Sequence, residues 1–72
     1  MKRKNIIPYE PVGRMMEGFG AERVSQDAKV AMVDYLEEYA EKIGRLAAKY
    51  AAHAGRVTII DKDIELAEKQ LN

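Results

Sequence analysis

Apolar residues recur at helical spacing along most of the chain and predict three helices. The longest segment, residues 26–54, contains no proline, and its apolar positions lie three and four residues apart. They fall into two neighbouring stripes, which indicates a helix contacted from more than one side. One stripe consists of Met32, Leu36, Tyr39, Ile43, Leu46, Tyr50 and Ala54, and the other of Val33, Ala40, Ala47 and Ala51.

The length of this central segment indicates that the chain does not fold alone. About 29 residues at 1.5 Å each give roughly 44 Å, which exceeds the width of a globule of this size. The chain has 72 residues, 47% of them hydrophobic, and no cysteine that could form a stabilising disulfide. A chain this short buries only about 60% of the surface that its unfolded form exposes. We therefore expect an obligate dimer or a larger assembly.

A short helix is expected before the long one. Pro11 suits its first turn, because the N–H that proline lacks would have no intrahelical partner there. Gly20 is suited to the position just past its end. Residues 1–8 show no periodic pattern and predict a flexible basic tail, whose anchor, if any, lies around Ile7 to Tyr9. The apolar residues of this helix are Val12, Met15, Met16 and Phe19.

Local signals also mark both ends of the long helix and the start of a third. Ser25 is expected to cap the long helix with its side-chain oxygen, and Asp27 favours the positive helix end. Gly55 ends the helix, and residues 57–60 form a short extended piece. A last helix begins at Asp61 or a neighbouring residue. Its apolar face consists of Ile64, Ala67 and Leu71.

Gly44 interrupts the long helical pattern and has two interpretations. Glycine inside a helix costs about 1 kcal/mol relative to alanine. The position is therefore either a tolerated weak point or a place where two long helices cross with their backbones close together.

Charge and residue type exclude several classes of function. Twelve Lys and Arg balance twelve Asp and Glu, unlike the strongly basic composition of many nucleic-acid binders. No apolar run is long enough to cross a membrane. His53 is the sole histidine and no cysteine is present, so neither a nucleophile nor a metal set is evident. The acidic residues of the long helix are interpreted as a solvated face without a cleft, which argues against an enzyme and against any cofactor; they are Asp34, Glu37, Glu38 and Glu41.

Contact with nucleic acid finds more support, from placement instead of total charge. Arg14 lies in the first helix, Arg23 precedes the long helix and Thr58 follows it. Helix N-termini suit phosphate, and arginine reaches into a narrow minor groove or bridges phosphates. Each residue alone is equally consistent with an ordinary surface position. Together they form a site only if the fold brings them to one edge.

Several segments of the chain resemble segments of one known family, in the same order and at the same spacing. The residues are Pro11-Val12-Gly13-Arg14, Gly20-Ala21-Glu22-Arg23-Val24-Ser25, His53-Ala54-Gly55-Arg56 followed by Thr58, and Asp63-Ile64-Glu65-Leu66-Ala67. From about Pro8 to Leu71, the chain resembles the archaeal histones. The resemblance implies an all-α histone fold over residues 9–72, in a homodimer that pairs head to tail in a handshake.

The same resemblance implies where double-stranded DNA binds. Arg23 would lie beside Thr58 of the partner subunit, and each such pair would hold backbone phosphates. Arg14 would point toward the minor groove where the groove faces the protein. These contacts would bind DNA with little sequence specificity.

Further residues resemble structural and assembly positions of that family. Arg56 and Asp63 would form an ion pair within the chain. Tyr50, His53 and Asp63 would join dimers into a tetramer or larger assembly, with His53 bonded to Asp63 of a neighbouring dimer; a solitary buried histidine is the alternative. Gly20 would let successive dimers stack closely.

The chain also departs from the family. Val57 and Ile60 stand where lysine is usual, and Glu17 where a basic residue is frequent, so fewer phosphate contacts predict weaker and less salt-dependent binding. Asp34 would face Glu65 in the stacking contacts, a repulsion that opposes long fibres. The segment Lys2-Arg3-Lys4 would either restore affinity or serve as a solubilising tail.

The sequence thus predicts a chromosome-associated protein of the cytoplasm that compacts DNA by wrapping or bridging. The rival hypothesis is a histone-fold interaction module that pairs with other histone-fold chains and binds DNA weakly or not at all. The zero net charge and the absent loop lysines favour the rival, and the retained Arg14, Arg23 and Thr58 oppose it.

Overall fold

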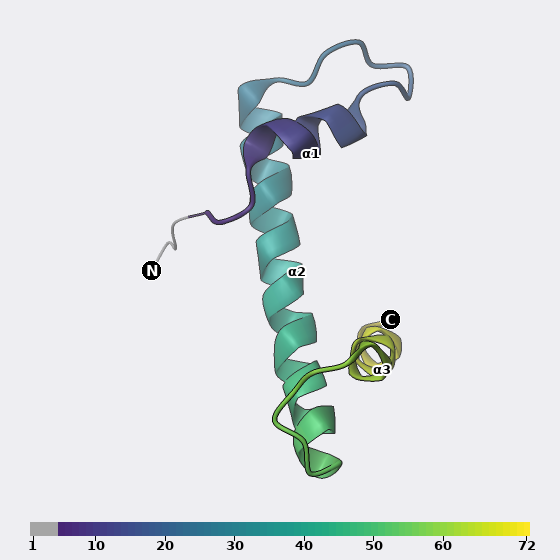
Figure 1. Ribbon diagram of the computed structural model, residues 1–72. Coiled ribbons are helices and arrows are strands. Elements are labelled where there is room, and N and C mark those ends of the chain that lie inside the picture. The colour runs from purple at the N-terminus through teal and green to yellow at the C-terminus, as the bar shows by residue number, and fades with distance from the viewer. Residues whose placement is uncertain (1–4) are drawn as a thin grey trace. The chain divides into compact units, whose positions relative to one another are not determined.

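A computed structural model describes residues 5–72, and this part of the chain is entirely helix and loop. The helices are α1 (Tyr9–Met16), α2 (Gln26–His53) and α3 (Asp61–Leu71), shown in Figure 1. The predicted all-α class is confirmed, and no residue from 5 to 72 is in a strand. The predicted tail segment Lys2-Arg3-Lys4 lies outside the described residues. The chain divides into two compact units, one up to Glu38 and one from Tyr39, with α2 passing through both.

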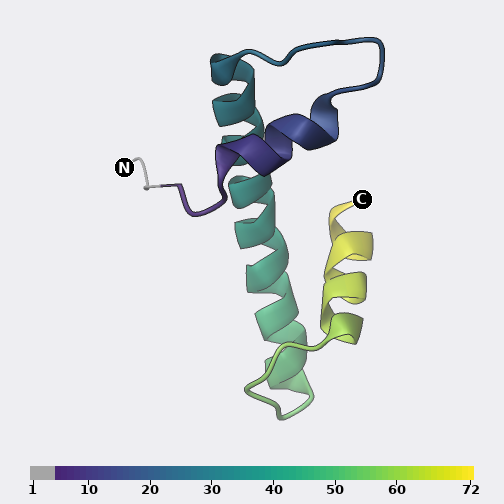
Figure 2. The same ribbon diagram turned by 45° about the horizontal axis from the view of Figure 1, so that its top comes forward.

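In the first unit, α1 lies across the beginning of α2 (Figures 1 and 2). Pro11 falls within the first turn of α1, as predicted. Among residues 5–38, the buried apolar side chains are Val12 of α1 and Val33 of α2. Two such side chains form a small core, so polar contacts between α1 and α2 contribute a large share of what holds α1 in place.

One of these polar contacts passes over a glycine. Lys29 of α2 donates a hydrogen bond to Glu10 of α1 at 2.8 Å, and its side chain is only 15% exposed. A Cβ atom at Gly13 would lie 2.7 Å from Cε of Lys29. Because Gly13 has no side chain, the stem of Lys29 has room to cross α1 at this position.

The end of α1 differs from the prediction. The helix ends at Met16, and Glu17 is extended with ψ of 156°, so Gly18 takes the left-handed position with φ of +99°. Gly20, predicted to end the helix, is also left-handed but lies further along the loop. Phe19 is therefore a loop residue, 87% exposed, and not part of the apolar face of the helix.

The ends of α2 agree with the prediction. The Ser25 side-chain oxygen accepts a hydrogen bond from the backbone N–H of Ala28 at 3.1 Å, as an N-cap does. At the other end, the Arg56 N–H bonds to the carbonyl of Ala51 at 2.9 Å and Gly55 is left-handed with φ of +75°. With the Gly55 N–H bonded to Ala52, these contacts form a Schellman motif.

In the second unit, α3 lies alongside the latter part of α2 (Figure 2). Ala67 of α3 is fully buried against Ile43 and Ala47 of α2. The small alanines let the two helices approach closely, and larger side chains surround the contact. These half-buried neighbours are Tyr39, Leu46 and Tyr50.

The single chain leaves many large apolar side chains exposed, namely Ile6, Met15, Phe19, Tyr35, Val57, Ile59, Ile60, Ile64, Leu66 and Leu71. Such exposure fits the expected dimer, because a monomer of this size has too few neighbours to cover a long helix on all sides.

A Cβ atom added at Gly44 would meet no side chain and no neighbouring element within 4 Å, so within the chain the small size of this glycine is unused. Its role in a helix crossing stays a prediction.

None of the helices in residues 5–72 combines the length and the apolar character needed to cross a membrane.

Candidate nucleic-acid interface

Both candidate arginines of the first unit are exposed. Arg14 lies in the last turn of α1, and Arg23 lies in the loop that leads to the Ser25 cap of α2. Arg14 also borders a shallow hollow formed with the small residues of that loop and with Glu17 and Glu22. The exposed cations are thus available to phosphate, and the two carboxylates limit how positive this surface becomes.

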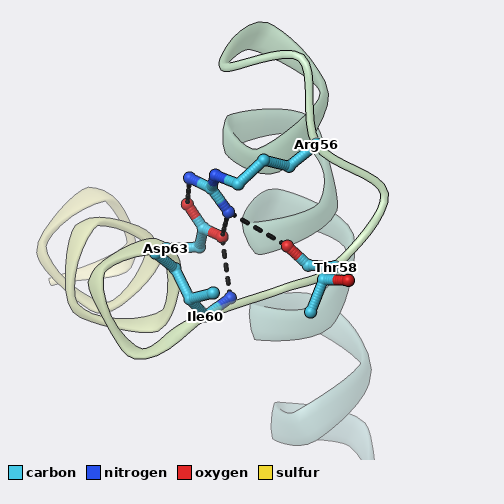
Figure 3. Close-up of polar contacts among 4 residues, drawn as sticks. All are labelled: Arg56, Thr58, Ile60 and Asp63. Atoms are coloured by element: carbon cyan, nitrogen blue, oxygen red, sulfur yellow. Dashed lines mark hydrogen bonds and ion pairs between the residues drawn. The ribbon is translucent and has the colours of Figure 1, made fainter.

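In the second unit, Arg56 ties the loop after α2 to the beginning of α3 (Figure 3). Its guanidinium donates to both carboxylate oxygens of Asp63, with Nη1–Oδ2 at 2.8 Å and Nη2–Oδ1 at 3.0 Å. Nη1 also donates to the backbone carbonyl of Thr58 at 3.0 Å. The structure therefore brings Arg56 and Asp63 together and fixes the exposed residue Thr58 beside them.

Asp63 is also part of the cap of α3. Its Oδ2 accepts a hydrogen bond from the backbone N–H of Ile60 at 2.9 Å, which satisfies a donor at the helix beginning. The residue is 2% exposed, and no buried side-chain oxygen or nitrogen of the described residues lacks a partner. The Arg56 hydrogen bonds, and then that of Ile60, lower the pKa of Asp63 below its ordinary value of 3.8, although burial opposes them.

This lowered pKa predicts how stability depends on pH. Because the folded state favours the carboxylate, the contribution of Asp63 is complete above pH 3.8 and is lost as the pH falls through the folded-state pKa. The difference in free energy of unfolding between the wild type and Asp63→Asn should therefore shrink below about pH 4. Denaturant unfolding followed by circular dichroism from about pH 7 to about pH 2.5 tests this, and a difference independent of pH would contradict it.

The residues proposed for contacts between dimers are placed as follows. The Tyr50 hydroxyl donates to Gln70 of α3 at 2.8 Å, and His53 is exposed at the end of α2 beside Lys49. His53 is thus not a buried histidine in the single chain. Asp63 already accepts three hydrogen bonds. A bond from His53 of another dimer would have to use the remaining capacity of its Oδ1.

The acidic residues of α2 differ from the prediction of a solvated face. Asp34 and Glu37 are half-buried, and both accept hydrogen bonds from the side-chain amide of Asn5 at 2.9 Å. Glu37 also accepts the backbone N–H groups of Ile6 and Ile7, at 2.5 and 2.7 Å. Glu38, in contrast, is exposed as expected, and Glu41 is half-buried and paired with Arg45. The solvated-face interpretation is therefore wrong for Asp34 and Glu37, which bind the segment before α1.

These contacts also bear on the predicted tail. The flexible tail was predicted to extend to residue 8, but residues 5–7 are hydrogen-bonded to α2. The Tyr9 hydroxyl adds a bond to the Asn5 side-chain carbonyl at 2.6 Å. The anchor expected around Ile7 to Tyr9 thus begins earlier, at Asn5. Its partners on α2 are about thirty positions away and the residues carry no motif, so the sequence did not indicate Glu37 as the partner.

The residues that depart from the family pattern lie on the surface. Val57 is 105% exposed, as open to solvent as in an extended chain, and Ile60 is also exposed. Glu17 lies beside Arg14 at the shallow hollow. Neither apolar residue serves the core of this chain, so packing within the chain does not explain why Val57 and Ile60 stand where the resemblance implies lysine.

Comparison with known proteins identifies the class to which this fold belongs. Residues 5–67 match the family described as histone-like transcription factor (CBF/NF-Y) and archaeal histone. The chain is 48% identical over 63 residues to a subunit of the archaeal histone HAN1 of Thermococcus zilligii, covering 88% of this chain and 94% of that protein. It is 36% identical over 61 residues to the probable archaeal histone 3 of Methanocaldococcus jannaschii, covering 85% and 91%.

The chain therefore belongs to the histone-fold family of histone-like transcription factors and archaeal histones. The predicted resemblance and histone fold are confirmed. Members of this family are structural proteins, in agreement with the prediction that the chain is not an enzyme.

Proposed function

We propose that the chain is an archaeal-type histone that binds double-stranded DNA as a homodimer and compacts it with little sequence specificity. The observation that carries the proposal is the similarity over 88% of the chain to a protein named as part of an archaeal histone. The exposed positions of Arg14 and Arg23 support it. Binding would rest on phosphate contacts and on arginine in the minor groove, which tolerate any sequence.

The proposed site is composite. Arg23 of one protomer would lie beside Thr58 of its partner, at each end of the dimer. Arg56 supports this arrangement, because its bond to the Thr58 carbonyl fixes the backbone of the second loop. Tyr50, His53 and Asp63 would join dimers into tetramers or larger assemblies, and Gly20 would allow close stacking. The protein would then be associated with the chromosome, in the nucleoid.

A second candidate is a role in an assembly of two different histone-fold chains. Two observations favour it: the net charge is zero, and Val57 presents an apolar side chain at the loop where phosphate contact is proposed. One relative is itself named as a subunit of its histone. A more basic partner chain would supply the phosphate contacts that this chain has lost.

Nuclease digestion of the protein bound to random-sequence duplex DNA tests the proposal. We expect the chain alone to protect DNA, with protected lengths that rise in regular steps if dimers wrap DNA in succession. Absence of protection even at low salt would contradict the homodimer proposal. Protection that appears only after a basic histone-fold chain is added would support the second candidate.

A further inference from the structure

Glu37 holds the chain immediately before α1. One carboxylate oxygen, Oε2, accepts the backbone N–H groups of Ile6 and Ile7, and the other, Oε1, accepts the amide of Asn5. Hydrogen bonds to a charged acceptor are stronger than neutral ones. The three donors are consecutive in sequence, so a single side chain of α2 fixes the backbone two residues ahead of Tyr9, where α1 begins.

The helix that follows has little else to fix its direction. α1 has eight residues, and only Val12 and Gly13 are buried. A helix this short is not stable by itself and takes its orientation from its contacts. Val12 packs in the small core, and Glu10 forms an ion pair with Lys29 of α2. Glu37 therefore supplies the fixed point at the N-terminal end of α1.

We propose that Glu37 is a positioning residue for DNA binding, which aims Arg14 by fixing the beginning of α1. Arg14 lies in the last turn of the same helix, so a change in direction at the beginning moves its guanidinium. Phosphate and minor-groove contacts of arginine depend on that position. This inference rests on the proposed function, in which Arg14 contacts DNA.

Because Glu37 is an acid, a positioning role and a purely electrostatic effect predict opposite changes in DNA affinity when its charge is removed. A carboxylate near DNA repels phosphate, so its removal alone should tighten binding. In Glu37→Gln, one of the two accepting oxygens becomes an NH₂ group, which donates and cannot accept. If Glu37 positions Arg14, the substitution should weaken binding although it makes the protein more positive.

The experiment compares the wild type with Glu37→Gln, Arg14→Ala and the double variant, by gel shift and by affinity as a function of salt. Glu38→Gln is the matched control, because Glu38 is the exposed neighbour and loses the same charge. We expect Glu37→Gln to bind about threefold or more weakly, with a shallower salt dependence. Glu38→Gln should bind equally well or more tightly. The double variant should bind no more weakly than Arg14→Ala.

Three outcomes would overturn the inference while leaving the proposed function intact: tighter or unchanged binding by Glu37→Gln, equal weakening by Glu38→Gln, or additive losses in the double variant. An Arg14→Ala protein that binds normally would instead contradict the role of Arg14 in the proposed function. Thermal melts confirm that each variant is folded at the binding temperature. If Glu37→Gln does not fold, Asn5→Ala takes its place. It removes the bond to Oε1 of Glu37 together with the Asn5 bonds to Asp34 and Tyr9, keeps the two backbone bonds to Oε2, and should weaken binding to a smaller extent.

Discussion

Replacing Arg56 with methionine is expected to destabilise the second unit strongly. Methionine keeps much of the apolar stem but donates no hydrogen bond. Asp63, which is 2% exposed in the wild type, would keep a single hydrogen bond to its carboxylate, from the Ile60 N–H. Asp63 is the buried partner of this ion pair, whereas 33% of the Arg56 side chain is exposed. Removing the cation costs far more than the pair contributes, because an uncompensated charge is left on the buried carboxylate. The melting temperature at fixed protein concentration should fall by roughly 10 °C or more.

The chain contains a matched control for this substitution. Arg45 pairs with Glu41 at 3.7 Å on the surface of α2, with 76% of its side chain exposed. Because Arg45 is largely exposed and the 3.7 Å contact is long, this pair contributes little, so Arg45→Met should change the melting temperature by only about 2 °C. Equal effects of Arg45→Met and Arg56→Met would show that the burial of Asp63 is unimportant. Because Arg56 also holds the Thr58 carbonyl, folded Arg56→Met protein should bind DNA more weakly as well.

The second large effect is expected for Arg23→Ala, on DNA affinity. A dimer would lose two phosphate contacts, one at each end, and would release correspondingly fewer counterions on binding. The slope of log affinity against log salt should become shallower by about 1.8, and affinity at about 0.1 M salt should fall roughly tenfold or more. The loss should be equal for unrelated duplex sequences, because phosphate contacts carry no sequence information.

Arg45→Ala is again the control, since it removes the same charge from an exposed site on α2. Affinity should then fall much less than in Arg23→Ala. A loss of the same size in both variants would indicate a general charge effect instead of a contact at Arg23. Gel shift at several salt concentrations measures both quantities, and thermal melts should show that Arg23→Ala, at an exposed loop position, is as stable as the wild type.

The parts of the fold that could be predicted from the sequence are those controlled by local chemistry. Ser25 precedes an uninterrupted helical pattern and is found as its cap. Gly55 follows that pattern and is found in the left-handed position that ends the helix. Each signal acts within a few residues, so the sequence contains all of the information needed. The predicted end of α1 was wrong because Gly18 and Gly20 both suit a helix terminus, and the apolar Phe19 between them favoured the later one.

The contact between Glu37 and the segment before α1 is of another kind. It joins residues about thirty positions apart through backbone N–H groups, which nearly every residue provides. Periodicity placed Glu37 on a polar face of α2 but could not reveal what that face binds. For the candidate DNA site, sequence supplied the residues through resemblance, whereas the arrangement across two protomers depends on a partner and stays a proposal.

Gly13 and Lys29 bear on how this protein could diverge in evolution. A methyl group at position 13 would meet the end of the lysine side chain, a flexible group that can move aside without disturbing the backbone. In moving, it would give up its 2.8 Å bond to Glu10. The three positions are therefore expected to covary. A homologue with a side chain at position 13 should have a shorter residue at position 29, and the acidic residue at position 10 would then no longer be constrained by an ion pair.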